Sequence, residues 1–189
     1  IIRLMNKRIQ NNYLNYLTDS YNNASKDFFD NDDFFISQIQ SSIGLFTEKS
    51  LNKGIPKPKE LEVYALLSGI SFENKIQKRL LNIQNEINAL IPEKLKYFVK
   101  PENLGLEHCV FKWPNEKWDT KKEKQVNNLL DIYPFESFNL EIIGIQIHSD
   151  GCVIAKGYDK ALQMEKIRSF FKNNLDFFPE KQSSWSHIP

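Results

Sequence analysis

The chain has 189 residues, 41% of them hydrophobic and 13% aromatic, and this composition excludes an intrinsically disordered protein. The 25 basic and 24 acidic side chains nearly cancel, so we expect no strong binding to duplex nucleic acid through an overall positive field. No apolar run approaches the roughly 20 residues that span a bilayer, and no signal peptide opens the chain, so we expect a cytoplasmic protein without a membrane partner.

The N-terminal part of the chain has the pattern of helices alone. Apolar residues recur at helical spacing in two stretches, residues 5–16 and 35–46, which predicts two amphipathic helices. Residues 50–59 contain one glycine and two prolines and are the best domain boundary in the chain. We therefore divide the chain into a helical N-terminal extension, residues 1–57, and a second domain, residues 58–189.

Beyond this boundary short strands alternate with helices. Strands are predicted at residues 61–67, 95–99, 104–113, 138–147 and 152–156, with the start of another at 183–189. Helices are predicted at residues 72–90, 120–133 and 161–171. Thr120 to Glu123 has the sequence of a capping box, and Ser149-Asp150-Gly151 is a strong hairpin signal. The pattern predicts an α+β domain.

One of the three histidines, His108, lies in the middle of the predicted strand at residues 104–113. Side chains alternate along a strand, so His108 shares a face with Leu106 and Val110. A histidine among apolar neighbours is either held by a hydrogen bond or faces a cleft, and the structural role is the more common one. A second histidine at the far end of the chain, His187, makes a catalytic role worth considering.

Two histidines can together cleave a phosphodiester, because one imidazole can remove a proton from the attacking oxygen and the other can protonate the leaving oxygen. The phosphoryl charge also needs a stabilising partner, and Lys112 and Ser186 are the candidates. Trp185 shares the face of His187 and could stack on a base. The alternative for Lys112 is a solvated charge, and the alternative for Trp185 is a core aromatic.

A metal site built from His108, His148 and His187 is the competing interpretation of the histidines. Their positions lack the close ligand spacing that is typical of zinc sites, so we predict neither a metal nor another cofactor. His148 lies at the rim of the predicted hairpin, where a polar turn residue is expected.

The order of the elements and the triplets His108-Cys109-Val110 and His187-Ile188-Pro189 resemble the two-histidine (2H) phosphoesterase superfamily. This family includes the bacterial RNA 2′,3′-cyclic phosphodiesterases, once called 2′-5′ RNA ligases. The resemblance covers residues 61–189, about two thirds of the chain. It implies a two-lobed α+β fold with two small antiparallel sheets around a cleft, and an N-terminal helical extension that the minimal family lacks. It also implies catalysis by His108 and His187.

Two positions depart from the family's motifs. The family carries Thr or Ser two residues after each histidine, facing the same cleft, where this chain has Val110 and Pro189. Pro189 also falls inside the expected second motif strand, which the given sequence does not complete. The missing hydroxyls predict a slow enzyme.

Three functions from different classes follow. The first is a metal-independent phosphodiesterase or cyclic phosphodiesterase that acts on RNA ends or small nucleotides through His108 and His187. The second is a catalytically weak relative of the same fold that binds nucleotides or RNA ends, which the missing hydroxyls favour. The third is a protein-interaction module in which the Phe-rich N-terminal helices bind a protein partner and the histidines are structural.

Overall fold

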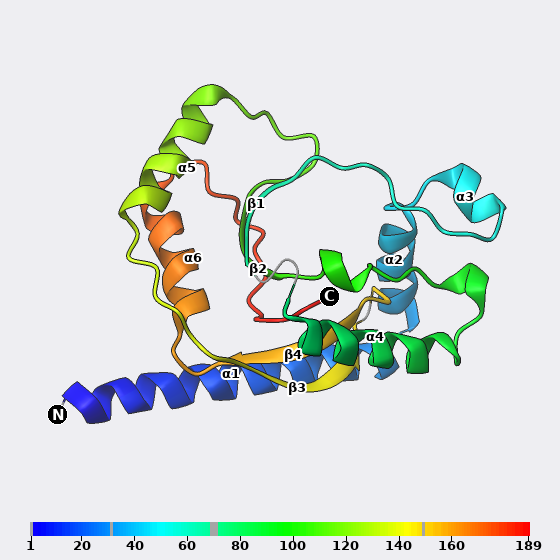
Figure 1. Cartoon of the computed structure of the whole chain (residues 1–189), viewed down its shortest axis with the longest axis horizontal. Helices are drawn as coiled ribbons and strands as arrows, with labels where there is room; N and C mark the ends of the chain where they lie inside the picture. Colours follow the sequence, from blue (N-terminus) through cyan, green and yellow to red (C-terminus); the bar gives the residue numbers. More distant parts are fainter. Residues whose placement is uncertain (1, 31, 69–71, 149) are drawn as a thin grey trace.

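The computed structural model describes the backbone of residues 2–30, 32–68, 72–148 and 150–189, and within these ranges the side chains of residues 9–24 and from 36 onward. This part of the chain forms six α-helices and two separate two-stranded antiparallel sheets (Figure 1). The α+β class and the two small antiparallel sheets are confirmed.

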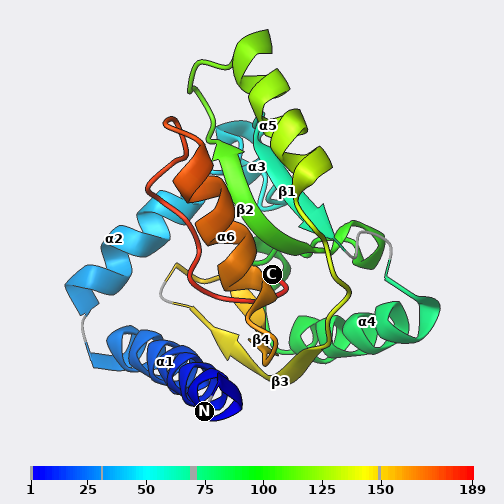
Figure 2. The same ribbon diagram turned by 90° about the vertical axis from the view of Figure 1, so that its left-hand side faces the viewer.

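The two predicted N-terminal helices are present as α1 (Ile2–Asp30) and α2 (Asp32–Ile43). Leu17 and Tyr21 of α1 are fully buried and form one apolar cluster with Ile154. Helix α1 therefore packs directly on the hairpin that contains Ile154, and it follows that hairpin along its length (Figures 1 and 2). A short helix that the sequence pattern did not predict, α3 (Glu48–Asn52), follows α2.

The first sheet pairs β1 (Tyr64–Ser68) with β2 (Leu106–Lys112), so that Ser68 lies opposite Leu106. Strand β2 is the predicted histidine strand, and it is buried along almost its whole length. Its partner β1 is half-buried to exposed, and Figure 2 shows the two strands side by side.

The second sheet is the predicted hairpin of β3 (Leu140–Ile147) and β4 (Val153–Asp159). Asp150 closes its turn, because its carboxylate accepts a hydrogen bond from the backbone N–H of Cys152 at 2.8 Å. The hairpin prediction is confirmed.

The three predicted helices of the second domain are present as α4 (Asn74–Asn88), α5 (Thr120–Ile132) and α6 (Gln163–Asn174). The predicted capping box is wrong by one residue. Asp119, not Thr120, is the N-cap of α5, and its carboxylate accepts a hydrogen bond from the N–H of Lys122 at 2.9 Å.

The strand predicted at residues 95–99 is wrong. A turn of 3₁₀ helix, Glu93–Leu95, is followed by irregular chain. Among the described residues β1 and β2 pair only with each other, so this segment has no strand to pair with. The amide side chain of Gln84 instead donates to the carbonyl oxygen of Val99 at 2.8 Å. The strand predicted at 183–189 is reduced to a single bridge between Ile188 and Ala155.

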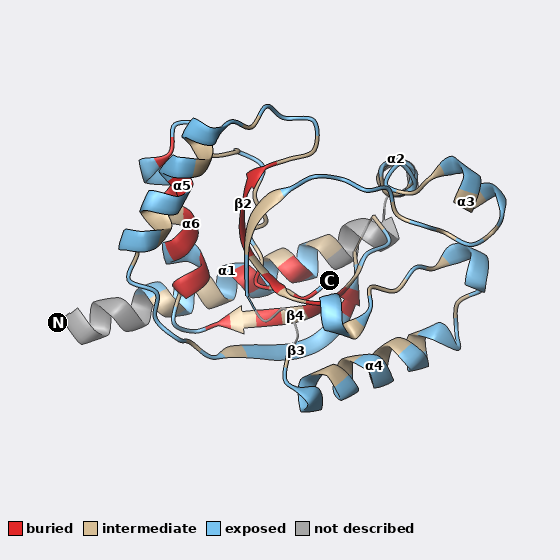
Figure 3. Cartoon of the chain, turned by 45° about the horizontal axis from the view of Figure 1, so that its top comes forward, coloured by how far each residue is buried: buried red, intermediate tan, exposed pale blue. Residues whose placement is uncertain are grey.

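The core lies on both sides of β2. Cys109 and Phe111 pack against α5 and α6, where the Phe111 and Phe171 ring centroids are 4.9 Å apart. On the opposite face, Leu104, which precedes β2, packs against Ala155 and Ile188. The predicted alternation is therefore confirmed, and Figure 3 shows the buried residues concentrated in β2, β4 and α6.

Candidate functional site

His108 is held in the core by β2, with 5% of its surface exposed. Its Nε2 lies 2.7 Å from the hydroxyl oxygen of Ser68, the last residue of β1. Pairing of Ser68 with Leu106 brings this hydroxyl beside the histidine, two residues along the same face of β2. Phe138 covers the ring edge-on, with the ring centroids 6.2 Å apart.

Arg168 of α6 connects the two histidine-bearing segments. Its guanidinium Nε donates to the carbonyl oxygen of His108 and its Nη2 donates to that of Trp185, each at 2.7 Å. Only 8% of Arg168 is exposed. No sequence pattern singled out Arg168, although it stands on the apolar face of α6 between Met164 and Phe171, where a charged side chain is unusual.

His187 lies in a C-terminal segment that crosses from the first sheet to the second. Gln182 holds the segment to β2 through hydrogen bonds with the backbone N–H and C=O of Val110, at 3.0 and 2.8 Å. Ile188 holds it to β4 through two backbone hydrogen bonds with Ala155, at 3.1 and 2.8 Å. The segment passes so close to β4 that a Cβ atom at Gly157 would overlap a backbone oxygen.

Burial sets the protonation of both histidines. The pKa of His108 and the pKa of His187 are both lowered to about 4, first by burial and then by the nearby charge of Arg168. Both imidazoles are therefore neutral at pH 7. In this form each imidazole can accept a proton from an attacking group. Few of the imidazoles are protonated at pH 7, so few can act as the general acid.

The two rings have different neighbours. The His108 ring contacts Ser68 and Phe138, whereas the His187 ring contacts Trp185, with centroids 5.8 Å apart. Within the described chain no hydrogen bond or ring contact joins His108 to His187. Arg168 brings their segments together through the backbone, and the Nδ1 atoms of both rings are buried without a partner among the described residues.

The predicted phosphate-binding residues occupy other surroundings. The Nζ of Lys112 lies 2.6 Å from a carboxylate oxygen of Glu62, so its charge is already paired. Ser186 is fully buried, and its hydroxyl lies beside that of Tyr13 without a hydrogen bond of good geometry in the described part of the chain. Val110, where the family carries a hydroxyl, is also fully buried.

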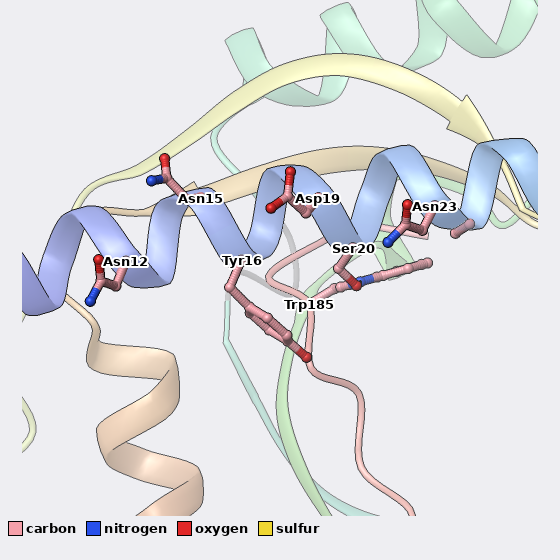
Figure 4. Close-up of a pocket in the computed structure, with 8 residues that line it drawn as sticks. Asn12, Asn15, Tyr16, Asp19, Ser20, Asn23 and Trp185 are labelled. Carbon is pink, nitrogen blue, oxygen red and sulfur yellow. The ribbon is translucent and has the colours of Figure 1, made fainter.

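Trp185 forms part of an open pocket of about 630 Å³ against one face of α1 (Figure 4). The pocket is lined by Asn12, Asn15, Tyr16, Asp19, Ser20, Asn23, Ala24 and Trp185. The indole Nε1 of Trp185 donates to the hydroxyl of Ser20 at 2.7 Å, and this hydrogen bond holds the indole ring against α1. The described lining contains no Lys or Arg, so the pocket suits a neutral polar group better than a phosphate.

His148 lies in the hairpin turn, as predicted, with Nδ1 3.3 Å from the Asp150 carboxylate and its ring 4.9 Å from that of Trp185. The hydrogen bond with His148 lowers the pKa of the Asp150 carboxyl more than any other contact does. The described residues include no group of three or more His, Cys, Asp or Glu side chains that could hold a metal ion. Nor do they include a helix whose length and apolarity would let it cross a membrane.

Ser68 and the asparagines of the pocket were likewise not predicted as site residues. Nothing in the sequence pairs Ser68 with His108, because the register of two strands 40 residues apart is set by packing. The asparagines did leave a signal, since Asn12, Asn15 and Asn23 recur with Asp19 at helical spacing. No protein-family model matches the chain, and neither does any curated protein or solved structure, so the family resemblance stays a prediction from the sequence.

Proposed function

We propose that the protein is a metal-independent phosphodiesterase or cyclic phosphodiesterase that acts on RNA ends or small nucleotides, with His108 and His187 as its acid and base. One observation carries the proposal. The two histidines come from segments attached to different sheets, and a single buried guanidinium, that of Arg168, binds the backbone of both segments. A substrate phosphate would lie between the two sheets, with one histidine from each.

The reaction needs only proton transfers from the protein. The neutral imidazole takes a proton from the attacking water or hydroxyl as its oxygen bonds to phosphorus. The protonated imidazole gives its proton to the leaving oxygen as the old phosphorus–oxygen bond breaks. No Lewis acid takes part in either transfer, so we expect turnover to continue in the presence of a chelator.

The pocket beside Trp185 supports a nucleotide as the substrate. It lies next to His187, because Trp185 contacts that ring and also lines the pocket. Its asparagine side chains both donate and accept hydrogen bonds, as the edges of a nucleobase require, and its volume is within the range of small-molecule sites. We expect the base in this pocket and the phosphate outside it.

Nucleotide binding without efficient catalysis is the second candidate. The observation that favours it is the pKa of about 4 for both histidines, which leaves only about one imidazole in a thousand protonated at pH 7. The buried, non-hydroxyl Val110 adds to this, because it cannot donate to a phosphate oxygen.

Binding of a protein partner by the N-terminal helices is the third candidate. Ile9, Tyr16, Ile36 and Ile43 of α1 and α2 each expose about half of their surface, between 48% and 52%. Exposed apolar side chains of this size supply the contacts of many protein interfaces.

Turnover of a panel of substrates separates these candidates. The panel contains 2′,3′-cyclic nucleotides, cyclic dinucleotides and 2′-5′-linked oligonucleotides, assayed with and without EDTA. His108→Gln and His187→Gln should each lower kcat/KM about a hundredfold or more, and the double variant should lose much less than the product of the two. His148→Gln, which changes a histidine held by Asp150, is the matched control and should lose little.

Two other outcomes reassign the function. Binding of nucleotides without turnover at any pH between 4.5 and 8 would favour the binding protein. Neither turnover nor nucleotide binding would favour the protein-interaction module. Activity that disappears in EDTA and returns with zinc would contradict the two-histidine mechanism.

A further inference from the structure

Ser68 and His108 have the geometry of a nucleophile and its base. The Ser68 hydroxyl oxygen lies 2.7 Å from His108 Nε2, within the range of a hydrogen bond between these atoms. Ser68 is exposed at the end of β1, whereas His108 is buried behind it. A reagent in solvent can therefore reach the hydroxyl, while the imidazole stays protected from solvent.

The histidine is also held in place from behind. Arg168 binds its carbonyl oxygen, and Phe138 covers its ring. A base with a fixed ring and a fixed backbone loses little freedom when it removes a proton, which is the requirement for activating a weak nucleophile such as serine.

We propose that Ser68 is a nucleophile activated by His108, and that the pair cleaves carboxylic esters by way of an acyl-enzyme, an activity separate from the phosphodiester reaction. In the first step, Ser68 Oγ bonds to the ester carbonyl carbon and its proton passes to His108 Nε2. The bond to the alcohol then breaks, and His108 returns the proton to the departing oxygen. Water, activated by the same imidazole, releases the acid from Ser68.

The reaction is slow, because the His108 Nδ1 atom has no partner among the described residues. In a complete triad a carboxylate binds the N–H at this position and fixes the tautomer in which Nε2 accepts a proton. Loss of that carboxylate's function costs about 10⁴-fold in known triads. Labelling by a reactive probe is therefore a more sensitive readout than turnover.

The test is reaction of the full chain with a fluorophosphonate probe, followed by intact-mass and peptide mass spectrometry. Ser68 Oγ displaces fluoride from phosphorus, so one adduct should form, on Ser68. Ser68→Ala should abolish it, and His108→Gln should slow it about a hundredfold or more. Ser184→Ala is the matched control, because Ser184 is exposed and makes no hydrogen bond with the described residues; labelling should be unchanged.

The pH dependence gives a second readout that a merely reactive surface serine would not share. Among the described residues, Arg168 from α6 is the charged group that acts on the His108 ring, and β1 brings only the Ser68 hydroxyl to it. With a base whose pKa is about 4, the labelling rate should stay constant from pH 8 down to about 5.5 and fall below that.

Three results would overturn the proposal: no adduct on Ser68 beyond that of the heat-denatured chain, an adduct that survives in Ser68→Ala, or a rate midpoint near pH 6.5, which belongs to an exposed histidine. If His108→Gln fails to fold, as judged by circular dichroism, Ser68→Ala and the pH profile still decide the matter. The assay contains no phosphodiester, so its result is independent of the turnover assay above.

Discussion

The Nε of Arg168 donates to the carbonyl oxygen of His108 at 2.7 Å, inside the core and 60 residues away along the chain. The same guanidinium binds the carbonyl oxygen of Trp185, two residues before His187. Burial lowers the pKa of Arg168, so the protein bears a desolvation cost to keep a cation here. The hydrogen bonds to backbone carbonyls offset that cost, because those acceptors would otherwise be buried without donors.

Replacing Arg168 by Met should lower the free energy of unfolding by about 2 kcal/mol. Two buried carbonyl groups lose their donors, at about 1–3 kcal/mol each, and relief of the desolvation of Arg168 returns part of the loss. Urea unfolding is the measurement. Arg79→Met on the exposed face of α4 is the control and should change stability by less than about 0.5 kcal/mol. Equal stability of Arg168→Met and the wild type would contradict the proposal that Arg168 holds the two backbone segments together.

Periodicity predicted the elements that have strong local patterns. The alternation of Leu106, His108 and Val110 identified β2, and the turn at Asp150 identified the hairpin, because both signals lie within a few adjacent residues. The strand at residues 95–99 was wrong because a strand exists only where another strand pairs with it, and its apolar pattern says nothing of a partner.

The site was less predictable for the same reason. His108 was noticed because histidine is rare in this chain, but its contacts with Ser68 and Arg168 join residues 40 and 60 positions apart. Such contacts depend on strand register and helix packing, which short-range patterns do not encode. Lys112 was assigned to a phosphate from its place on the strand, whereas the structure gives it Glu62 as a partner.

The rate of phosphodiester cleavage should rise as the pH falls. The reaction needs one neutral and one protonated imidazole, and with both pKa values near 4 the protonated fraction falls about tenfold for each pH unit above that value. We expect kcat/KM to increase about tenfold per unit between pH 8 and pH 5, with limbs that belong to the coupled pair. A maximum near pH 7 would show that neither histidine is buried during catalysis.

Stability should change with pH in the opposite sense. Each histidine has a pKa of about 4 when folded and about 6.5 when unfolded, so between these values the unfolded chain binds more protons. The part of the unfolding free energy that depends on these histidines is therefore greatest above about pH 6.5. It decreases as the pH falls toward 4, by at most about 1.4 kcal/mol per pH unit for each histidine.

Urea titrations at several pH values measure this slope. The double variant His108→Gln, His187→Gln should flatten it. Burial raises the pKa of Glu107, which acts in the opposite direction, so the comparison is between variants and not with zero slope. The same slope in the double variant would contradict the burial of the histidines.

Two tyrosines on one helix should respond differently to loss of the hydroxyl. The buried hydroxyl of Tyr21 donates to the carbonyl oxygen of Gly157 at 3.2 Å, whereas that of Tyr13 lies beside the Ser186 hydroxyl without a hydrogen bond of good geometry among the described residues. Tyr21→Phe should cost about 1 kcal/mol of unfolding free energy, and Tyr13→Phe should be neutral or stabilising. Urea unfolding of both variants provides the measurement, and each is the control for the other. A larger loss in Tyr13→Phe would refute the assigned contacts.

Gly157→Ala should detach the segment that carries His187. A methyl group at this position of β4 overlaps the carbonyl oxygen of Ser186, and a backbone atom cannot rotate away as a flexible side chain can. The segment must move, so we expect a loss of about 1–3 kcal/mol in unfolding free energy. Hydrogen exchange should also become faster at the N–H groups of Ala155 and Ile188, which bond across this contact.

Gly44→Ala is the control for the added methyl group. The nearest atom to a Cβ at Gly44 is the backbone oxygen of Ser41 at 3.0 Å, so the strain there is smaller and does not fall on the C-terminal segment. Exchange at Ala155 and Ile188 should then be unchanged. In Gly157→Ala, phosphodiester turnover should fall with the loss of protection, because His187 leaves its place beside Arg168 and Trp185. Unchanged exchange in Gly157→Ala would show that the segment does not lie against β4.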